Sequence, residues 1–385
     1  MGLSLGNPMD DLIGTLADLV RINSVNPAYP GGAPESAMAL YIQDFFEKRG
    51  IEVSQQSVFP GRPNVLATLR GRDPSRRIVF EAHTDTAGIL GMTIPPFEPR
   101  VCDGRLYGRG ACDTKAGAAA MMHAIASLAQ DRIQPRCEVV FAGTADEEHS
   151  YRGVVKLCEG LHADAAVVSE PTSLRLVVAT KGCLRFRIRV HGKAAHSSKP
   201  HLGVNAVSRM ARLILALEED ARALDRRPHA LLGPPTFNIG VIHGGTQVNI
   251  VPDSCVIEVD RRLVPGEEPE AVWKYYRRFV ESLRDSMPLF EAVVEEPILE
   301  DLPLETAVSE PVAAIASRVL ANLGLHSEPV GVPYGSDASK LARAGVPSIV
   351  FGPGNIDQAH AACEFVDCAE VRKAYEFYRQ FILSF

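Results

Sequence analysis

Apolar runs that end in acidic or imidazole residues recur along this chain and limit the folds open to it. Residues 78–82 lead directly into His83, and residues 165–168 lead through one serine to Glu170. Such a run is typical of a strand buried on both faces, and open α/β sheets bind ligands at the carboxyl ends of these strands. The pattern predicts a sheet with one edge that collects polar side chains.

Three more clusters have the same character. Asp113 lies between a glycine-rich turn and a predicted helix, Glu147 and Glu148 follow another apolar run, and His360 follows the run 349–351 and a Gly-Pro-Gly loop. Each cluster alone has an ordinary explanation, such as a histidine in a turn, a helix N-cap or a solvated acidic loop. Their recurrence after strand-like runs favours a single site.

Metal chemistry would explain the residue types. The Asp113 carboxylate could offer one oxygen to each of two cations, which lie about 3.5–4 Å apart in two-metal sites. The side chains of Glu147 and Glu148 diverge, so one could bind a metal while the other faces the attacking water. Asp85 is placed to hold the second nitrogen of His83. We therefore predict a binuclear centre that holds two Zn²⁺, although Co²⁺ or Mn²⁺ would suit the same ligands.

Composition excludes several classes of protein. A chain of 385 residues with 46% hydrophobic content suggests two domains. The net charge is -7 and the 40 Lys and Arg are scattered, which disfavours nucleic acid and membrane partners. No apolar run reaches the roughly 20 residues that span a bilayer, the first residues do not resemble a signal peptide, and the eight cysteines are not closely paired. We expect a cytoplasmic protein that acts on small molecules.

Hydrophobic periodicity predicts an α/β fold for the first part of the chain. The elements there are helices over 9–22, 35–49 and about 115–129, and strands over 51–58, 63–70, 76–82, 136–143 and 164–169. The hydrophobic pattern then changes at 183–191, where apolar and polar residues alternate strictly, as in a half-exposed strand. A second domain is expected to begin at about 182.

The second segment has the order βαββαβ of a ferredoxin-like unit. Its elements are expected over 183–191, 203–223, 236–243, 253–262, 268–285 and 289–295. The α/β pattern of the first part then resumes, with helices over 309–323, 336–343 and 367–384 and a short strand in 347–352. We predict a mixed-sheet catalytic domain, 1–181 and 297–385, interrupted by an inserted domain, 182–296.

The order and spacing of the clusters resemble the zinc-dependent metallopeptidase family that includes acetylornithine deacetylase, succinyl-diaminopimelate desuccinylase, the aminoacylases and carboxypeptidase G. By that resemblance His83 and Glu170 bind one zinc, Glu148 and His360 bind the other, and Asp113 bridges them. Glu147 is the general base and Asp85 holds His83. The resemblance also implies an inserted domain that serves as a lid and dimerises, and a cis peptide after Asp113.

Further residues are candidates for substrate contact. His196 matches a family histidine that reaches the active site of the partner subunit, where an imidazole donor would stabilise a tetrahedral intermediate. Asn249 lies in a glycine-rich turn similar to a substrate-contacting position, and Arg262 could pair bidentately with a substrate carboxylate. Gly335 and Ser336, in the loop 332–340, are further candidates.

The resemblance implies a homodimeric amidohydrolase that cleaves the amide bond of an N-acyl amino acid. A dipeptidase or carboxypeptidase, or a hydrolase of N-carbamoyl amino acids, is the nearest alternative on the same scaffold. A non-catalytic protein that binds an amino-acid derivative or a protein partner is the alternative from a different class. That alternative would most naturally lack a metal ligand or Glu147, and the sequence has all six residues.

Overall fold

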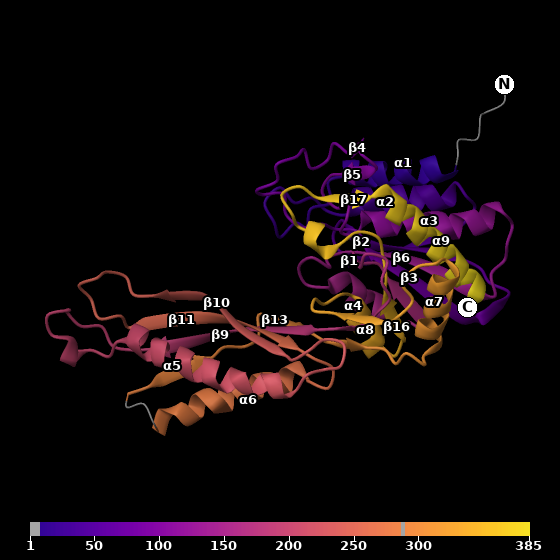
Figure 1. The fold of residues 1–385 in the computed structure, drawn as a ribbon. Coiled ribbons are helices and arrows are strands. Elements are labelled where there is room, and N and C mark those ends of the chain that lie inside the picture. The colour runs from indigo at the N-terminus through magenta and orange to yellow at the C-terminus, as the bar shows by residue number, and fades with distance from the viewer. Residues whose placement is uncertain (1–7, 286–288) are drawn as a thin grey trace. The chain divides into compact units, whose positions relative to one another are not determined.

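The computed structural model describes residues 8–285 and 289–385, and these form two compact units (Figure 1). The first unit contains Met1–Val178, Thr306–Val330 and Ser336–Phe385, and the second contains Ala179–Glu305 with Gly331–Gly335. Residues 1–7, which carry much of the prediction that no signal peptide is present, lie outside the described part. Among the described helices, none is both long and apolar enough to cross a bilayer.

The first unit is built on a mixed sheet. Within this unit the strand order is β1-β2-β6-β3-β7-β16-β8, and the short strand β14 and most of β15 belong to the second unit. The bounds are β1 Glu52–Phe59, β2 Arg62–Leu69, β3 Asp73–His83, β6 Cys137–Thr144, β7 Ala165–Val168, β8 Val177–Thr180, β14 Leu304–Glu305, β15 Val330–Val332 and β16 Ser348–Val350. Strands β6, β3, β7 and β16 are mutually parallel, whereas β1, β2 and β6 pair antiparallel. The predicted mixed α/β fold class is confirmed.

Helices cover this sheet, and their apolar residues form its core. They are α1 Pro8–Arg21, α2 Ser36–Glu47, α3 Lys115–Gln130, α4 Arg152–Cys158, α7 Pro311–Asn322, α8 Ala338–Arg343 and α9 Cys368–Ser384, with the 3₁₀ turn η4 Ile356–Gln358. Helix α3 is rich in alanine and almost wholly buried, which lets α1 and α9 pack closely against it. Phe80 of β3 packs edge-on against Tyr378 and Phe381 of α9.

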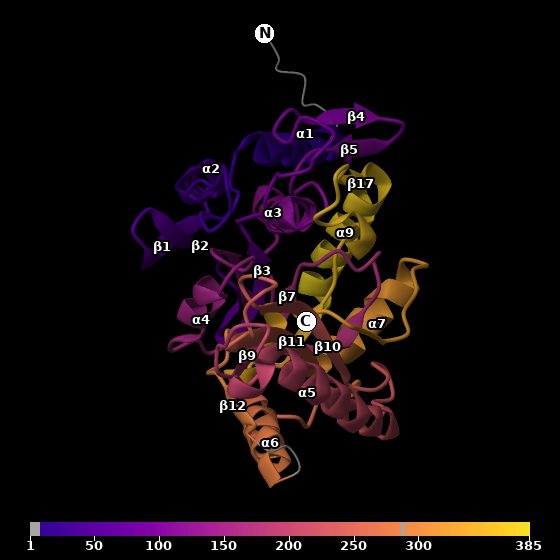
Figure 2. The ribbon, with the colours of Figure 1, turned by 90° about the vertical axis from the view of Figure 1, so that its left-hand side faces the viewer.

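The second unit has a βαββαβ order, as predicted for a ferredoxin-like unit. Its elements are β9 Gly182–His191, η1 Pro200–Leu202, α5 Ala206–Ala221, η2 Arg222–Arg226, β10 Thr236–Gly244, β11 Ser254–Leu263, α6 Pro269–Ser282, η3 Leu283–Asp285, β12 Glu291–Val294 and β13 Leu299–Asp301. The antiparallel sheet has the order β10-β11-β9-β12, with β13 also beside β9. Helices α5 and α6 lie on one face of it (Figure 2).

The two faces of this second sheet differ in chemistry. Leu184, Phe186, Ile188 and Val190 of β9 are fully buried in the cluster that includes the helices. The opposite face carries ion pairs between strands, of which Arg185 with Asp260 is one. This alternation explains the strict apolar and polar pattern of the sequence.

Several elements depart from the sequence-based expectations. Helix α5 begins at Ala206 rather than at 203, because the Asn205 side chain accepts a hydrogen bond from the Ser208 amide and caps the helix. Pairing of β13 with β9 carries the second unit past the expected limit at 296 to Asp301, and the unit ends at Glu305. A small sheet, β17-β5-β4, was not predicted; its strands are β4 Arg100–Cys102, β5 Arg105–Tyr107 and β17 Phe365–Asp367.

Candidate metal centre

The parallel strands of the first unit deliver the polar clusters to one edge of the sheet. His83 is the last residue of β3 and pairs in register with Thr144, the last residue of β6, which precedes the Glu147 loop. Strand β7 ends two residues before Glu170, and β16 leads into the loop that carries His360. Because parallel strands share the direction of their carboxyl ends, these side chains reach the same place.

Donor atoms gather there into two groups that share one residue. His83, Asp113 and Glu170 form one group, and Asp113, Glu148 and His360 form the other, with the donor atoms of each group within 4.8 Å of one another. Asp113 precedes α3, and its two oxygens face different imidazoles. Oδ1 lies 2.9 Å from Nε2 of His83, and Oδ2 lies 3.3 Å from Nε2 of His360.

Electrostatics in the cluster favour bound cations. Burial raises the pKa of the Glu147, Glu148 and Glu170 carboxyls, because several acids are crowded away from water. Hydrogen bonds to Asp113 and Glu148 raise the pKa of His360 to about 10. Protons on such imidazoles offset the acidic charge, and metal binding releases protons of this kind because ligands must be deprotonated.

The donor set therefore fits two divalent cations. It supplies two imidazole nitrogens and three carboxylates, and one of those carboxylates presents an oxygen to each group. Cations nearby would remove the penalty for keeping the buried acids charged. These residues thus form a candidate site for two metal ions.

Asp85 supports the site in a different way from the one its sequence position suggested. Nδ1 of His83 lies 3.0 Å from the backbone carbonyl oxygen of Asp85, and 3.7 Å from its carboxylate. The carboxylate instead accepts hydrogen bonds from the backbone amides of Glu147 and Glu148, both at 3.1 Å. A single residue therefore orients His83 through its carbonyl and fixes the Glu147 loop through its side chain.

A buried network that the sequence analysis missed supports Asp85. The Asn26 amide donates to Asp85 at 2.7 Å and to Asp146 at 3.0 Å. Arg62 binds Asp146 and also the buried carboxylate of Glu35. These residues lie up to 120 positions apart, and none sits in a recognisable motif, so only the tertiary structure reveals them.

The turn that carries Asp113 is held by a buried ion pair. The Glu364 carboxylate accepts hydrogen bonds from the amides of Cys112 and Asp113 at 2.9 and 3.1 Å, and Arg109 donates to it at 2.6 Å. The side chains of Arg109 and Glu364 are 3% and 1% exposed. The Asp113–Thr114 peptide bond is cis, as the family resemblance implied.

Replacing Glu364 with alanine is expected to destabilise the protein by about 3–5 kcal/mol, because it leaves the Arg109 charge buried and unpaired. Two backbone amides would also lose their acceptor. Urea denaturation followed by circular dichroism measures the effect. Glu376→Ala, on the exposed side of α9, is the matched control and should change the midpoint little. Equal midpoints for both variants would contradict the structural role given to Glu364.

The predicted substrate contacts are distributed over both units, and their roles stay predictions. His196 and Asn249 belong to neighbouring loops of the second unit, where the Ser197 amide donates to the Asn249 carbonyl at 3.0 Å. Arg262 is half-buried and pairs with Asp260 at 2.8 Å. Gly335 belongs to the second unit, and Ser336, in the first, is fully buried.

Comparisons with known proteins agree over nearly the whole chain. Residues 79–384 match the sequence profile of Peptidase family M20/M25/M40. Acetylornithine deacetylase of Myxococcus xanthus is 31% identical, with 94% of each chain covered. The structure of aminopeptidase PepT from Bacillus cereus is similar with a TM-score of 0.80 and 24% identity, covering 98% of each chain. The YxeP protein of Bacillus subtilis, a dinuclear metal binding peptidase, is similar with a TM-score of 0.73 and 20% identity, also covering 98% of each chain.

Proposed function

We propose that this chain, which belongs to peptidase family M20/M25/M40, is a two-metal amidohydrolase that removes the acyl group from an N-acyl amino acid. It is a hydrolase of amide bonds, as its family and its deacetylase relatives indicate. The observation that carries the proposal is the position of Asp113, whose two oxygens face two separate groups of donor atoms. Relatives at 31% and 30% identity are acetylornithine deacetylases, which favours a deacylase over a peptidase.

Zinc is the proposed metal, with cobalt or manganese as possible substitutes. His83 and Glu170 would hold one ion, Glu148 and His360 the other, and Asp113 both. Mixed imidazole and carboxylate donors suit zinc. Two bound cations supply the positive charge that polarises an amide carbonyl and lowers the pKa of the attacking water.

Glu147 is the proposed general base. Its amide is fixed by Asp85, and it precedes the proposed ligand Glu148 in the same loop. Burial raises the pKa of the Glu147 carboxyl, and a carboxylate close to a bound water is a common proton acceptor in hydrolysis. We assign it the removal of a proton from water during attack on the carbonyl carbon, and the delivery of that proton to the departing amine nitrogen.

His196 is proposed to donate a hydrogen bond to the oxygen of the tetrahedral intermediate. The backbone amide of Ser198 donates to Nδ1 of His196 at 3.1 Å, so the neutral ring carries its proton on Nε2. Nε2 is then a donor, as this role requires. Arg262 is the proposed partner of the substrate carboxylate. From the family resemblance we also propose a homodimer formed through the second unit, in which His196 acts in the partner's site. The cytoplasmic location is a proposal as well.

A kinetic panel tests the substrate class. N-acetylornithine and other N-acetyl amino acids are compared with dipeptides and N-carbamoyl derivatives of the same amino acids. We expect kcat/KM for at least one N-acetyl amino acid to exceed that of its dipeptide and carbamoyl counterparts by about tenfold or more. Contacts that fit one acyl group discriminate between substrates at about this level. A preference for dipeptides at the same metal content would replace the deacylase with a peptidase.

A further inference from the structure

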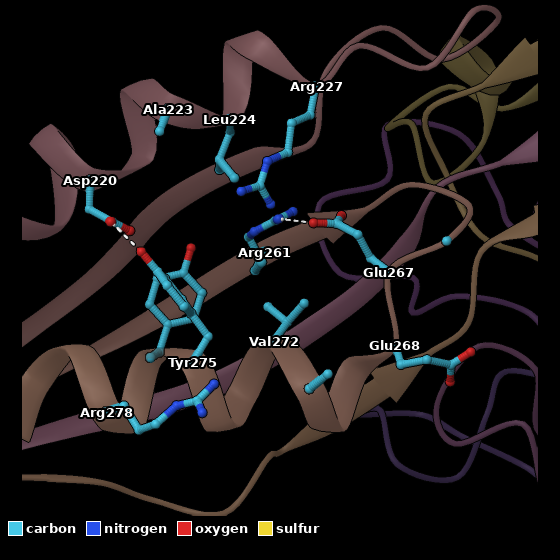
Figure 3. Close-up of a pocket in the computed structure, with 13 residues that line it drawn as sticks. Asp220, Ala223, Leu224, Arg227, Arg261, Glu267, Glu268, Val272, Tyr275 and Arg278 are labelled. Atoms are coloured by element: carbon cyan, nitrogen blue, oxygen red, sulfur yellow. Dashed lines mark hydrogen bonds and ion pairs between the residues drawn. The ribbon is translucent and has the colours of Figure 1, made fainter.

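A pocket of about 360 Å³ lies within the second unit, and none of its lining residues has been assigned a role above. It is enclosed by the end of α5, the turn η2, strand β11 and helix α6 (Figure 3). Leu224 and Val272 form apolar walls, and Tyr275 contributes a ring. This volume falls within the range of pockets that bind small organic molecules.

Arg261 occupies the floor of this pocket and breaks the pattern of its strand. Alternate residues of β11 face the helices and are buried. Apart from Arg261, the residues on that face are apolar or cysteine, as Val259 and Leu263 are. Arg261 is 2% exposed. Its terminal nitrogens donate to the Arg262 carbonyl and to Glu267, but Nε has no hydrogen-bond partner among the described residues. A buried N–H group without a partner is rare and calls for a ligand or another explanation.

A second guanidinium meets the first across the pocket. Arg227 follows η2, and its side chain points toward Arg261 in Figure 3. Within residues 8–285 and 289–385, the Arg227 side chain makes no hydrogen bond or ion pair. Two converging guanidiniums repel each other unless an anion lies between them.

The acids around the pocket are already engaged or point elsewhere. Asp220 accepts a hydrogen bond from the Tyr275 hydroxyl, and Glu267 binds both Arg261 and the Val264 amide. Glu268 points away from the two guanidiniums in Figure 3. The Arg227 guanidinium is therefore a charged group of the lining that is left to bind a ligand inside the pocket.

We propose that this pocket binds a small amphipathic carboxylate. Its oxygens would accept hydrogen bonds from Arg227, since guanidinium groups match the geometry of carboxylates, and Arg261 at the floor of the pocket would lie beneath them. Its apolar body would lie against Leu224, Val272 and the ring of Tyr275. These walls favour an organic carboxylate over a free inorganic anion. The chain thus has a ligand site besides its metal centre.

The test is the binding of 3-phenylpropanoate to the full-length, metal-loaded protein. Calorimetry gives the affinity, and fluorescence of Trp273, the one tryptophan of the chain, reports on the second unit. Trp273 lies on α6 beside Val272 and donates to the Glu295 carbonyl at 3.0 Å. We expect saturable binding that changes this fluorescence, and much weaker binding of the neutral 3-phenylpropanamide.

Arg227→Met should weaken the affinity for 3-phenylpropanoate by about tenfold or more, because it removes a charge-assisted hydrogen bond. Arg222→Met, at the start of η2 and outside the pocket, is the matched control and should leave the affinity unchanged. Arg227 is exposed, so its replacement should not impair folding, and Arg227→Gln provides an independent repeat.

Several results would overturn the proposal. These are no binding to the wild type at millimolar concentration, equal affinity in the wild type and Arg227→Met, and binding of the amide as tight as that of the carboxylate. Phosphate that binds as tightly as 3-phenylpropanoate would also overturn it, because the apolar walls would then contribute nothing.

Discussion

Glu147→Gln is expected to reduce kcat by about 100- to 10,000-fold while both metals stay bound, because glutamine keeps the shape of glutamate but accepts no proton at neutral pH. Glu147 belongs to neither group of clustered donor atoms. Its loss should therefore leave the metal content at two equivalents per chain and change KM little. Steady-state kinetics and elemental analysis of the same preparation measure both quantities.

The neighbouring position gives a matched control for this result. Glu148 lies in the same loop, and its Oε1 is 3.0 Å from Nε2 of His360, within the second donor group. Glu148→Gln should lower the metal content as well as kcat. A Glu147→Gln enzyme with near-normal kcat, or one that loses metal as Glu148→Gln does, would remove Glu147 from the role of base.

The sequence could predict the edge of the sheet where the donors meet, because each strand there is mostly apolar and leads into a polar residue, although Glu81 interrupts the run in β3. His83 and Glu170 are found in this way, and the parallel pairing of β3 with β7 places them together. Helix α3 and strand β9 could also be predicted, because the spacing of their apolar residues indicates which positions are buried.

Contacts between distant segments carry no such local signal. Phe365 of β17 pairs with Tyr107 of β5, across more than 250 positions, in strands of three residues each. The support of Asp113 by Glu364 spans 251 positions, and the support of Asp85 by Asn26 spans 59. Asp85 contacts His83 through its backbone carbonyl, whereas the sequence suggested that its carboxylate would make this contact.

The supporting residues also explain why the acids of the site keep one geometry. The carboxylate of Asp85 is fixed by three donors, and Asp146 is tied to Arg62, so the Glu147 loop is anchored on both sides. Side chains held in this way need little rearrangement when ligands bind. The shared ligand Asp113 is anchored separately, through Glu364 and Arg109.

Asp113→Asn is expected to reduce metal binding in both groups at once and to lower activity by at least about 1,000-fold, because two-metal catalysis needs both ions. Asparagine keeps the size of the side chain but removes its charge and one of the two oxygens that face His83 and His360. The metal content should fall well below two equivalents per chain. Replacing a residue that serves one group alone should spare the other ion.

Thermal unfolding with and without a chelator gives a readout of Asp113 that does not depend on activity. Ions that bind only the folded state stabilise it, so a chelator should lower the Tm of the wild type. In Asp113→Asn this decrease should nearly vanish, whereas Asp131→Asn, at the other end of α3, should keep it in full. A decrease in Asp113→Asn as large as in the wild type would show that the two donor groups do not depend on their common carboxylate.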